Sequence, residues 1–190
     1  TASCGTSSTV PITGRKQNIL VSDEQVLSLS NQQYQEYMKQ AKASQDATST
    51  AMVKRCGERL ASAVVSYLQQ NGLAAEVSQY KWEFNLVQDK SVNAFCMPGG
   101  KIVVYEGLLP VTKDESSLAI VLGHEIAHAV AKHSAERLSN EVRKQYGAQI
   151  IGGVLQGAGA SANLQNISSA VFGIGTTLGG AAYSRKQENE

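Results

Sequence analysis

The sequence predicts a mostly helical α+β domain in which a small β-sheet packs beside one buried helix. Apolar residues recur at three- and four-residue steps over residues 22–41 and 50–70, as they do on amphipathic helices. Between Val77 and Val87 the period changes to two, as in a strand with one buried face. The run from Leu118 to Ala131 is apolar on nearly all sides, which is typical of a helix at the centre of its domain.

Length and composition favour a single domain with a sizeable core. The chain has 190 residues, and 42% of them are hydrophobic. Its 17 basic and 16 acidic residues almost cancel, so we expect no nucleic-acid partner. No stretch approaches the roughly 18 consecutive apolar residues that a transmembrane helix needs.

Local signals predict where the elements begin and end. The sequences Ser22-Asp23-Glu24-Gln25 and Thr112-Lys113-Asp114-Glu115 are patterned as capping boxes, and each should open a helix. Between them, the cluster at residues 44–49 should end the first helix, and a second should run from about Thr50 to Gln70. Pro98-Gly99-Gly100 separates two β-prone runs, residues 92–97 and 101–105, which should pair across a tight turn.

The buried helix contains a motif that points to metal chemistry. His124 and His128 lie four residues apart, so both imidazoles can face one ion while Glu125 stands beside the first. In this HExxH arrangement the histidines bind Zn²⁺ and the glutamate is the general base of a metalloprotease. The alternative is a chance pair of histidines. Unpaired polar groups are costly in a buried helix, however, and a metal would give them a partner.

A catalytic zinc ion usually has three protein ligands and keeps one position for water. His133, the remaining histidine, is excluded, because on the helix it would lie about 140° from His128 and about 180° from His124. Acidic residues further along the same run are too distant. A carboxylate from the acidic C-terminal stretch, residues 183–190, is the natural remaining choice.

The three cysteines, Cys4, Cys56 and Cys96, lack the short paired spacing of structural zinc sites. Cys4 follows small residues and precedes a Ser/Thr-rich tail, which resembles the processing site of a bacterial lipoprotein. Cys4 is therefore a candidate for lipidation, and the alternative is a free cysteine in a disordered tail. A disulfide between Cys56 and Cys96 is conceivable in an oxidising compartment.

The chain divides into a short leader and one domain. Residues 1–21 are expected to be an extended N-terminal leader, a candidate lipoprotein tether, and residues 22–190 to be a single domain. Within it, residues 147–182 are rich in Gly and Ala, and glycine weakens a helix by about 1 kcal/mol per interior site. We expect mobile or loosely packed helices there. Plain helix packing is the expected role, with an active-site cover or a lipid-surface segment as alternatives.

Taken together, these residues resemble the HtpX/Oma/CAAX-prenyl-protease family of zinc endopeptidases, and within it the periplasmic, non-spanning branch. The resemblance covers about residues 50–190 and rests on His124 to His128, residues 93–100, Gly107-Leu108-Leu109, and Ser184-Arg185 before Glu188. It implies a zincin-like metalloprotease domain of the gluzincin type with one Zn²⁺ per chain. It also implies a place in the bacterial cell envelope, in the periplasm or as an outer-membrane lipoprotein.

The resemblance also implies roles for residues that spacing alone leaves open. The family's third zinc ligand is the first Glu of an E-x-x-x-D motif, which falls on Glu188. The matching Asp would be position 192, so we expect a domain cut inside its ligand helix, with weakened metal binding. Either the segment with Asn93, Ala94 and Phe95 or the one at residues 101–105 is the edge strand that binds an extended substrate.

The sequence thus predicts a zinc endopeptidase that cleaves envelope or misfolded proteins, with extended or unfolded polypeptides as substrates. His124, His128 and Glu188 are the predicted ligands, and Glu125 is the predicted base. A lipid anchor on Cys4 would add a membrane surface as a partner. The alternative is a proteolytically silent, chaperone-like envelope module that binds unfolded chains in the same cleft. A purely structural zinc site is less expected, because such sites usually have four protein ligands.

Overall fold

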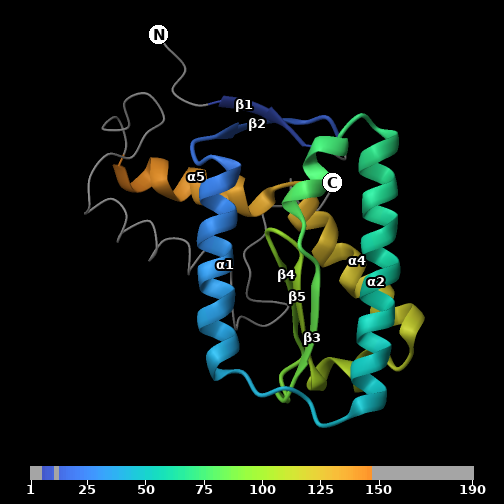
Figure 1. Cartoon of the computed structure of the whole chain (residues 1–190). Coiled ribbons are helices and arrows are strands. Elements are labelled where there is room, and N and C mark those ends of the chain that lie inside the picture. The colour runs from blue at the N-terminus through green and yellow to red at the C-terminus, as the bar shows by residue number, and fades with distance from the viewer. Residues whose placement is uncertain (1–5, 11–12, 147–190) are drawn as a thin grey trace.

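The computed structural model describes residues 6–10 and 13–146. It confirms the mostly helical α+β class (Figure 1). Cys4, Glu188 and the Gly/Ala-rich segment at 147–182 lie outside the described residues. The elements, in chain order, are β1 (Thr6–Thr9), β2 (Lys16–Ile19), α1 (Asp23–Gln40), α2 (Ala47–Gln70), the 3₁₀ helix η1 (Ala74–Gln79), β3 (Glu83–Val87), β4 (Ala94–Met97), β5 (Lys101–Tyr105), the 3₁₀ helix η2 (Glu106–Leu108), α3 (Leu109–Thr112), α4 (Glu115–Val130) and α5 (His133–Tyr146).

The first two long helices begin at side-chain caps. At α1 the predicted capping box is confirmed: Gln25 N donates to Ser22 Oγ at 3.2 Å, and Ser22 N donates to Gln25 Oε1 at 3.0 Å. The helix ends at Gln40, before the cluster that was expected to stop it. The second helix begins earlier than expected, at Ala47, because Asp46 accepts a 3.0 Å hydrogen bond from the amide of Ser49.

A three-stranded sheet forms the centre of the molecule, in the order β3-β5-β4. Strand β4 runs antiparallel to β5 across the predicted tight turn, where Gly99 and Gly100 have φ of 91° and 85°. Strand β3 runs parallel to β5 and is shorter than predicted. The preceding residues form η1 instead, closed by a 3.2 Å hydrogen bond from Tyr80 N to the carbonyl of Val77.

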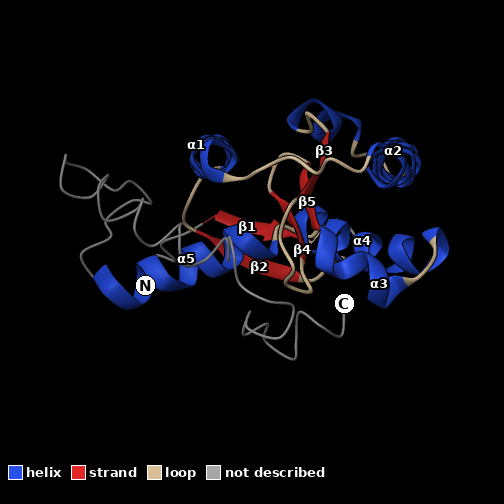
Figure 2. Ribbon diagram, turned by 90° about the horizontal axis from the view of Figure 1, so that it is seen from below, coloured by secondary structure: helices blue, strands red, loops and turns tan. Residues whose placement is uncertain are grey.

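The sheet is covered on both faces, and each face has its own apolar cluster. In Figures 1 and 2, α1 lies on one side of the sheet and α2 with α4 on the other. The α1 side also takes apolar residues from β2 and α5, and includes Val26, Tyr34, Phe95, Met97, Val103, Leu138 and Val142. The α2 and α4 side includes Val53, Leu68, Ile102, Val104, Leu118, Leu122 and Ile126. The motif helix is therefore built into the larger apolar layer.

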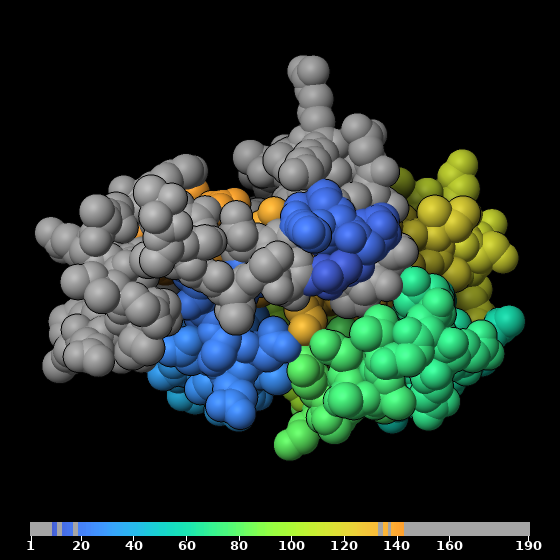
Figure 3. All heavy atoms as spheres, turned by 90° about the horizontal axis from the view of Figure 1, so that it is seen from above, coloured from blue at the N-terminus to red at the C-terminus, as the bar shows by residue number. Residues whose placement is uncertain are grey.

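The described part of the N-terminal leader folds onto the domain as a hairpin of β1 and β2. Arg15 makes a two-pronged ion pair with Glu136 of α5, with N–O distances of 2.8 and 3.0 Å. The amide of Leu20 donates to Ser139 Oγ at 2.9 Å. In the space-filling view the hairpin atoms, in dark blue, lie on the outer surface with orange atoms of α5 nearby (Figure 3). This arm is thus fixed to the helix that follows the motif.

Across residues 6–10 and 13–146, no helix combines the length and the hydropathy needed to cross a bilayer.

Candidate metal centre

Helix α4 carries the motif, and both its start and its end differ from the sequence prediction. It begins at Glu115, with Asp114 as its N-cap: Asp114 Oδ1 accepts from the amide of Ser117 at 2.7 Å. The predicted capping box at Thr112 is wrong, because Thr112 belongs to α3 and its hydroxyl donates to the carbonyl of Leu109. Apolar burial then holds the helix in place, since Leu118 and Leu122 are fully buried against the sheet layer.

The helix does not continue through His133. It ends at Val130, Lys132 adopts a left-handed φ of 58°, and His133 is the first residue of α5. The angles that excluded His133 as a ligand assumed one continuous helix, so that argument is wrong. Glu136 is also on α5, where it pairs with Arg15. The absence of His133 from the metal site stays a prediction, now without support from helical spacing.

The two motif histidines converge as predicted. Their Nε2 atoms lie 3.0 Å apart, and the rings meet edge to face at 89°. A tetrahedral zinc ion with Zn–N bonds of about 2.0–2.1 Å would place two ligand nitrogens about 3.3 Å apart. The observed pair is close to that geometry without any change of backbone. His128 is buried, at 8% exposure, while His124 is exposed, so the pair faces outward from the core.

Two ligands do not complete a zinc site. Among residues 6–10 and 13–146, no group of three His, Cys, Asp or Glu side chains is placed to hold a metal ion. The third ligand therefore stays a prediction. The predicted C-terminal carboxylate, Glu188, lies outside the described residues.

Glu125 lies on the inner side of the motif, at 5% exposure, where α4 packs against β4. The thiol of Cys96, on β4, is close enough for the charge of Glu125 to affect its pKa. Burial raises the pKa of Cys96, and the negative charge of Glu125 raises that pKa further. Cys96 was singled out in the sequence only for a disulfide with Cys56, and that expectation is wrong because both are free thiols. Side chains alternate along a strand, so Cys96 lies on the same face of β4 as Ala94. That face packs against α4, which carries Glu125.

Of the two predicted edge strands, β4 lies at the edge of the described sheet and β5 lies at its centre. The amide of Tyr105 donates to the carbonyl of Asn93 at 3.0 Å, which fixes the alternation of the antiparallel ladder. Phe95 and Met97 then bond inward to β5, and the N–H and C=O groups of Ala94 and Cys96 point away from β5, to the outer edge of the described sheet. The side chains of Asn93, Ala94 and Phe95 are all buried.

An apolar hollow of about 390 Å³ lies between α2 and α4, on the other flank of the motif helix. Neither His124 nor His128 lines this hollow. The candidate metal site is therefore located by the convergence of the two imidazoles and not by the hollow. The residues that line the hollow are Leu60, Ala63, Val64, Tyr67, Gly123, Ile126, Ala127 and Val130.

A buried helix with two converging histidines, a buried glutamate between them and an adjacent edge strand defines the class of HExxH zinc metallopeptidases. Within that class, the chain belongs to peptidase family M48, whose model matches residues 47–190. The resemblance seen in the sequence is therefore confirmed at the level of the family.

Three relatives show how much of the chain is shared. The mitochondrial metalloendopeptidase OMA1 of Schizosaccharomyces pombe is 52% identical over 63 residues, which are 33% of this chain and 19% of that protein. The OMA1 of Homo sapiens is 34% identical over 127 residues, 67% of this chain and 24% of that protein. A putative beta-barrel assembly-enhancing protease of Vibrio cholerae is 30% identical over 123 residues, 62% of this chain and 25% of that protein. The chain thus spans about a fifth to a quarter of these relatives.

Proposed function

We propose that this chain is the catalytic domain of a zinc-dependent endopeptidase that cleaves extended or unfolded polypeptides. The observation that carries the proposal is the 3.0 Å convergence of His124 Nε2 and His128 Nε2, with Glu125 buried beside them. Membership of peptidase family M48 supports the same reaction. One metal ion per chain would be held by His124, His128 and Glu188.

The two imidazoles fit this role because their ring nitrogens are the donors that zinc prefers, and they already face one point. Zinc, when bound, supplies Lewis acidity, which polarises a carbonyl and lowers the pKa of a coordinated water to about 7. The burial of His128 and Glu125 keeps solvent away from one side of the centre.

Glu125 is the general base of the proposed reaction. Its carboxylate takes a proton from the attacking water and later delivers it to the nitrogen of the leaving amine. A glutamate can serve both steps because its carboxylate accepts the proton in the first step and donates it in the second. The side chain of Glu125 is buried at 5% exposure where α4 packs against β4, which limits the rotamers that it can adopt.

The substrate would lie along β4 as an additional strand. The outward N–H and C=O groups of Ala94 and Cys96 would bond to the main chain of an extended peptide, which needs little sequence specificity. The buried side chains of Asn93, Ala94 and Phe95 would support the strand from behind, so their part in binding is to hold the main chain.

We also propose that the protein acts in a bacterial cell envelope on envelope or misfolded proteins. The relative named as a beta-barrel assembly-enhancing protease supports this setting. Lipidation of Cys4 would tether the domain to a membrane surface in the periplasm. Mass spectrometry of protein isolated from its native membrane tests the tether, and an unmodified Cys4 thiol would rule it out.

The replacement of Glu125 by Gln tests the reaction. The variant should keep zinc at the wild-type level, because the histidines are unchanged, and should lose cleavage of an unfolded protein such as casein. Glu115→Gln is the matched control, since Glu115 lies at the other end of α4 and points to the surface, near Arg55. Casein cleavage retained by Glu125→Gln would rule out the mechanism.

A further inference from the structure

Lys132 has an unusual backbone conformation directly after the motif helix. It is one of two non-glycine residues with positive φ among the described residues, with φ of 58°. Helices often end on such a left-handed residue, and glycine is preferred there because a Cβ atom makes this conformation unfavourable. Lysine at this position therefore needs a reason that lies in its side chain.

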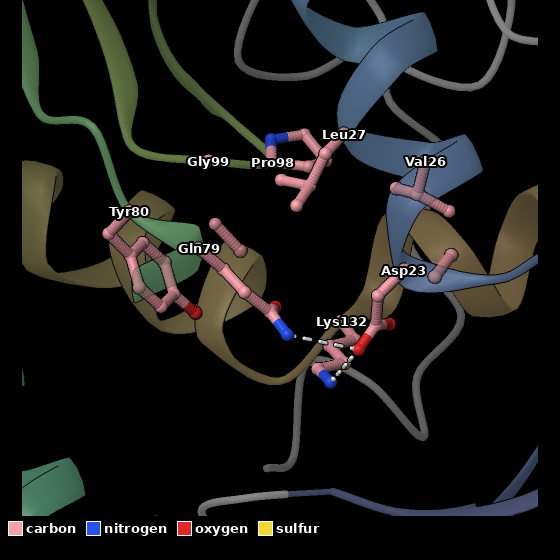
Figure 4. Close-up of a pocket in the computed structure, with 10 residues that line it drawn as sticks. Asp23, Val26, Leu27, Gln79, Tyr80, Pro98, Gly99 and Lys132 are labelled. Carbon is pink, nitrogen blue, oxygen red and sulfur yellow. Dashed lines mark hydrogen bonds and ion pairs between the residues drawn. The ribbon is translucent and has the colours of Figure 1, made fainter. Parts of the chain in front are cut away.

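The Lys132 side chain joins three separate elements. Its Nζ atom lies 2.7 Å from Asp23 Oδ2, at the first residue of α1, and 3.0 Å from both carboxylate oxygens of Glu76 in η1. Asp23 also accepts a 3.3 Å hydrogen bond from Gln79 Nε2 (Figure 4). The lysine side chain is only 13% exposed. Burial alone would lower the pKa of Lys132, but the hydrogen bonds and charges of Asp23 and Glu76 raise it overall.

These contacts lie next to a metal ligand. His128 is in the last turn of α4, where the amide of Ala131 donates to the carbonyl of Ala127 at 2.8 Å. The ends of helices open locally more easily than their centres. A ligand held by such a turn would lose its orientation whenever the turn opened, yet a metal site needs its donor atoms held within a fraction of an ångström.

We propose that Lys132 is a positioning residue for the metal centre. Through its ion pairs with Asp23 and Glu76 it clamps the last turn of α4, and so keeps His128 aligned with His124. This inference rests on the proposed function in one respect, namely that the two histidines bind zinc. The clamp itself is a property of the protein without metal.

The structure suggests why Lys is used here and not Gly. Glycine would satisfy the backbone but would remove the ion pairs that connect the end of α4 to α1 and η1. Lysine has an unfavourable backbone conformation at this position, but its side chain connects the end of α4 to α1 and η1. The conformation of Lys132 therefore lowers local stability, while its ion pairs fix the position of the helix end.

The replacement Lys132→Gly, made in the full chain, separates these two effects. It relieves the backbone strain and removes the clamp, so Tm should stay within a few degrees of the wild type. Zinc affinity, measured by chelator competition, should fall about 10- to 100-fold, the usual effect of removing a group that orients a metal ligand. In the metal-free protein, hydrogen exchange of the peptide covering Ala127 to Ala131 should become faster.

Two further variants control the experiment. Lys132→Arg keeps the charge and should retain most of the zinc affinity. Arg15→Met breaks the ion pair between the N-terminal hairpin and α5 without touching Lys132, and should leave zinc affinity and exchange at Ala127 to Ala131 unchanged. Should Lys132→Gly fold poorly, Glu76→Gln removes one arm of the clamp and should give a smaller change in the same direction.

Unchanged exchange and unchanged zinc affinity in Lys132→Gly would overturn the proposal. So would equal losses in Lys132→Gly and Arg15→Met together with a lower Tm, because the effect would then be one of general stability. A wild-type protein that binds no zinc would refute the proposed function instead. The exchange measurement on the metal-free protein would still decide whether Lys132 clamps the helix end.

Discussion

The two ends of α4 are held in different ways. At the N-terminal end the cap is local, since Asp114 accepts from the amide of Ser117, and the ion pair that joins Glu115 to Arg55 of α2 is exposed, with the Arg55 side chain 57% exposed. At the C-terminal end the ion pairs are distant in sequence and largely buried, since Lys132 reaches Asp23 and Glu76. The histidines lie in the C-terminal half. The half that carries the chemistry is thus fixed by tertiary ion pairs that are more buried than the ion pair at the other end.

The largest effect, a loss of zinc affinity, is expected from replacing a histidine in the C-terminal half of α4. His128→Ala removes one of two converging donors, so zinc affinity should fall by more than the roughly 100-fold caused by changes around a ligand. His133→Ala should leave affinity unchanged, although His133 begins the next helix. Metal analysis after dialysis against a chelator measures both. Equal zinc loss in the two variants would show that His133 is a ligand.

The next largest effect is expected from removing a buried side chain in the middle of α4. Leu122→Ala should destabilise the protein by about 2–5 kcal/mol, because a fully buried leucine leaves a cavity. Ile120→Ala, two residues away but 75% exposed, should change stability by less than about 0.5 kcal/mol. Urea unfolding of the metal-free proteins gives both values. Similar losses at the two positions would mean that the outer face of α4 is also covered.

Alkaline pH should loosen the C-terminal end selectively. The folded state raises the pKa of Lys132 above its ordinary value of 10.5, so its contribution to stability is complete below that pH and is lost as pH rises through the folded-state pKa. Lys132→Arg stays charged at higher pH. We expect the variant to keep its Tm better than the wild type above pH 10.5, with no such difference at pH 8. If the Tm of the wild type and that of Lys132→Arg fell equally with rising pH, the result would contradict a contribution of the Lys132 ion pairs to stability.

The smallest effect is expected at the N-terminal cap, with the opposite dependence on pH. Hydrogen bonds from the backbone and side chain of Ser117 lower the pKa of Asp114 below 3.8. Its contribution is therefore present above pH 3.8 and is lost as pH falls through the lowered pKa. Asp114→Asn keeps a capping oxygen without the charge. Its Tm should decline slightly less steeply in acid, and a steeper decline would contradict this account.

The same contrast explains what could be predicted from the sequence. The HExxH spacing, the cap at Ser22 and the turn at Gly99 and Gly100 are local patterns, and the structure confirms them. The family follows from the motif in its wider context. All of these signals span a few residues or repeat with a regular period.

The failures have physical causes of two kinds. Thr112 matched a capping pattern, but Asp114 is nearer to the helix start and took that role. The end of α4 could not be predicted, because Lys132 does not usually adopt a left-handed conformation and its partners lie 109 and 56 residues away. The edge position of β4 in the described sheet likewise depends on the pairing of β5 with β3, which is distant in sequence. The roles of Glu188 and Cys4 stay predictions, since both residues lie outside the described part of the chain.

Zinc X-ray absorption spectroscopy tests the central claim most directly. Wild-type protein loaded with one equivalent of zinc should show two imidazole ligands, with the remaining positions filled by oxygen at about 2.0–2.2 Å. His133→Ala should give the same spectrum. A zinc–sulfur distance of about 2.3 Å, or a third imidazole that disappears in His133→Ala, would contradict a centre built on His124, His128 and a carboxylate.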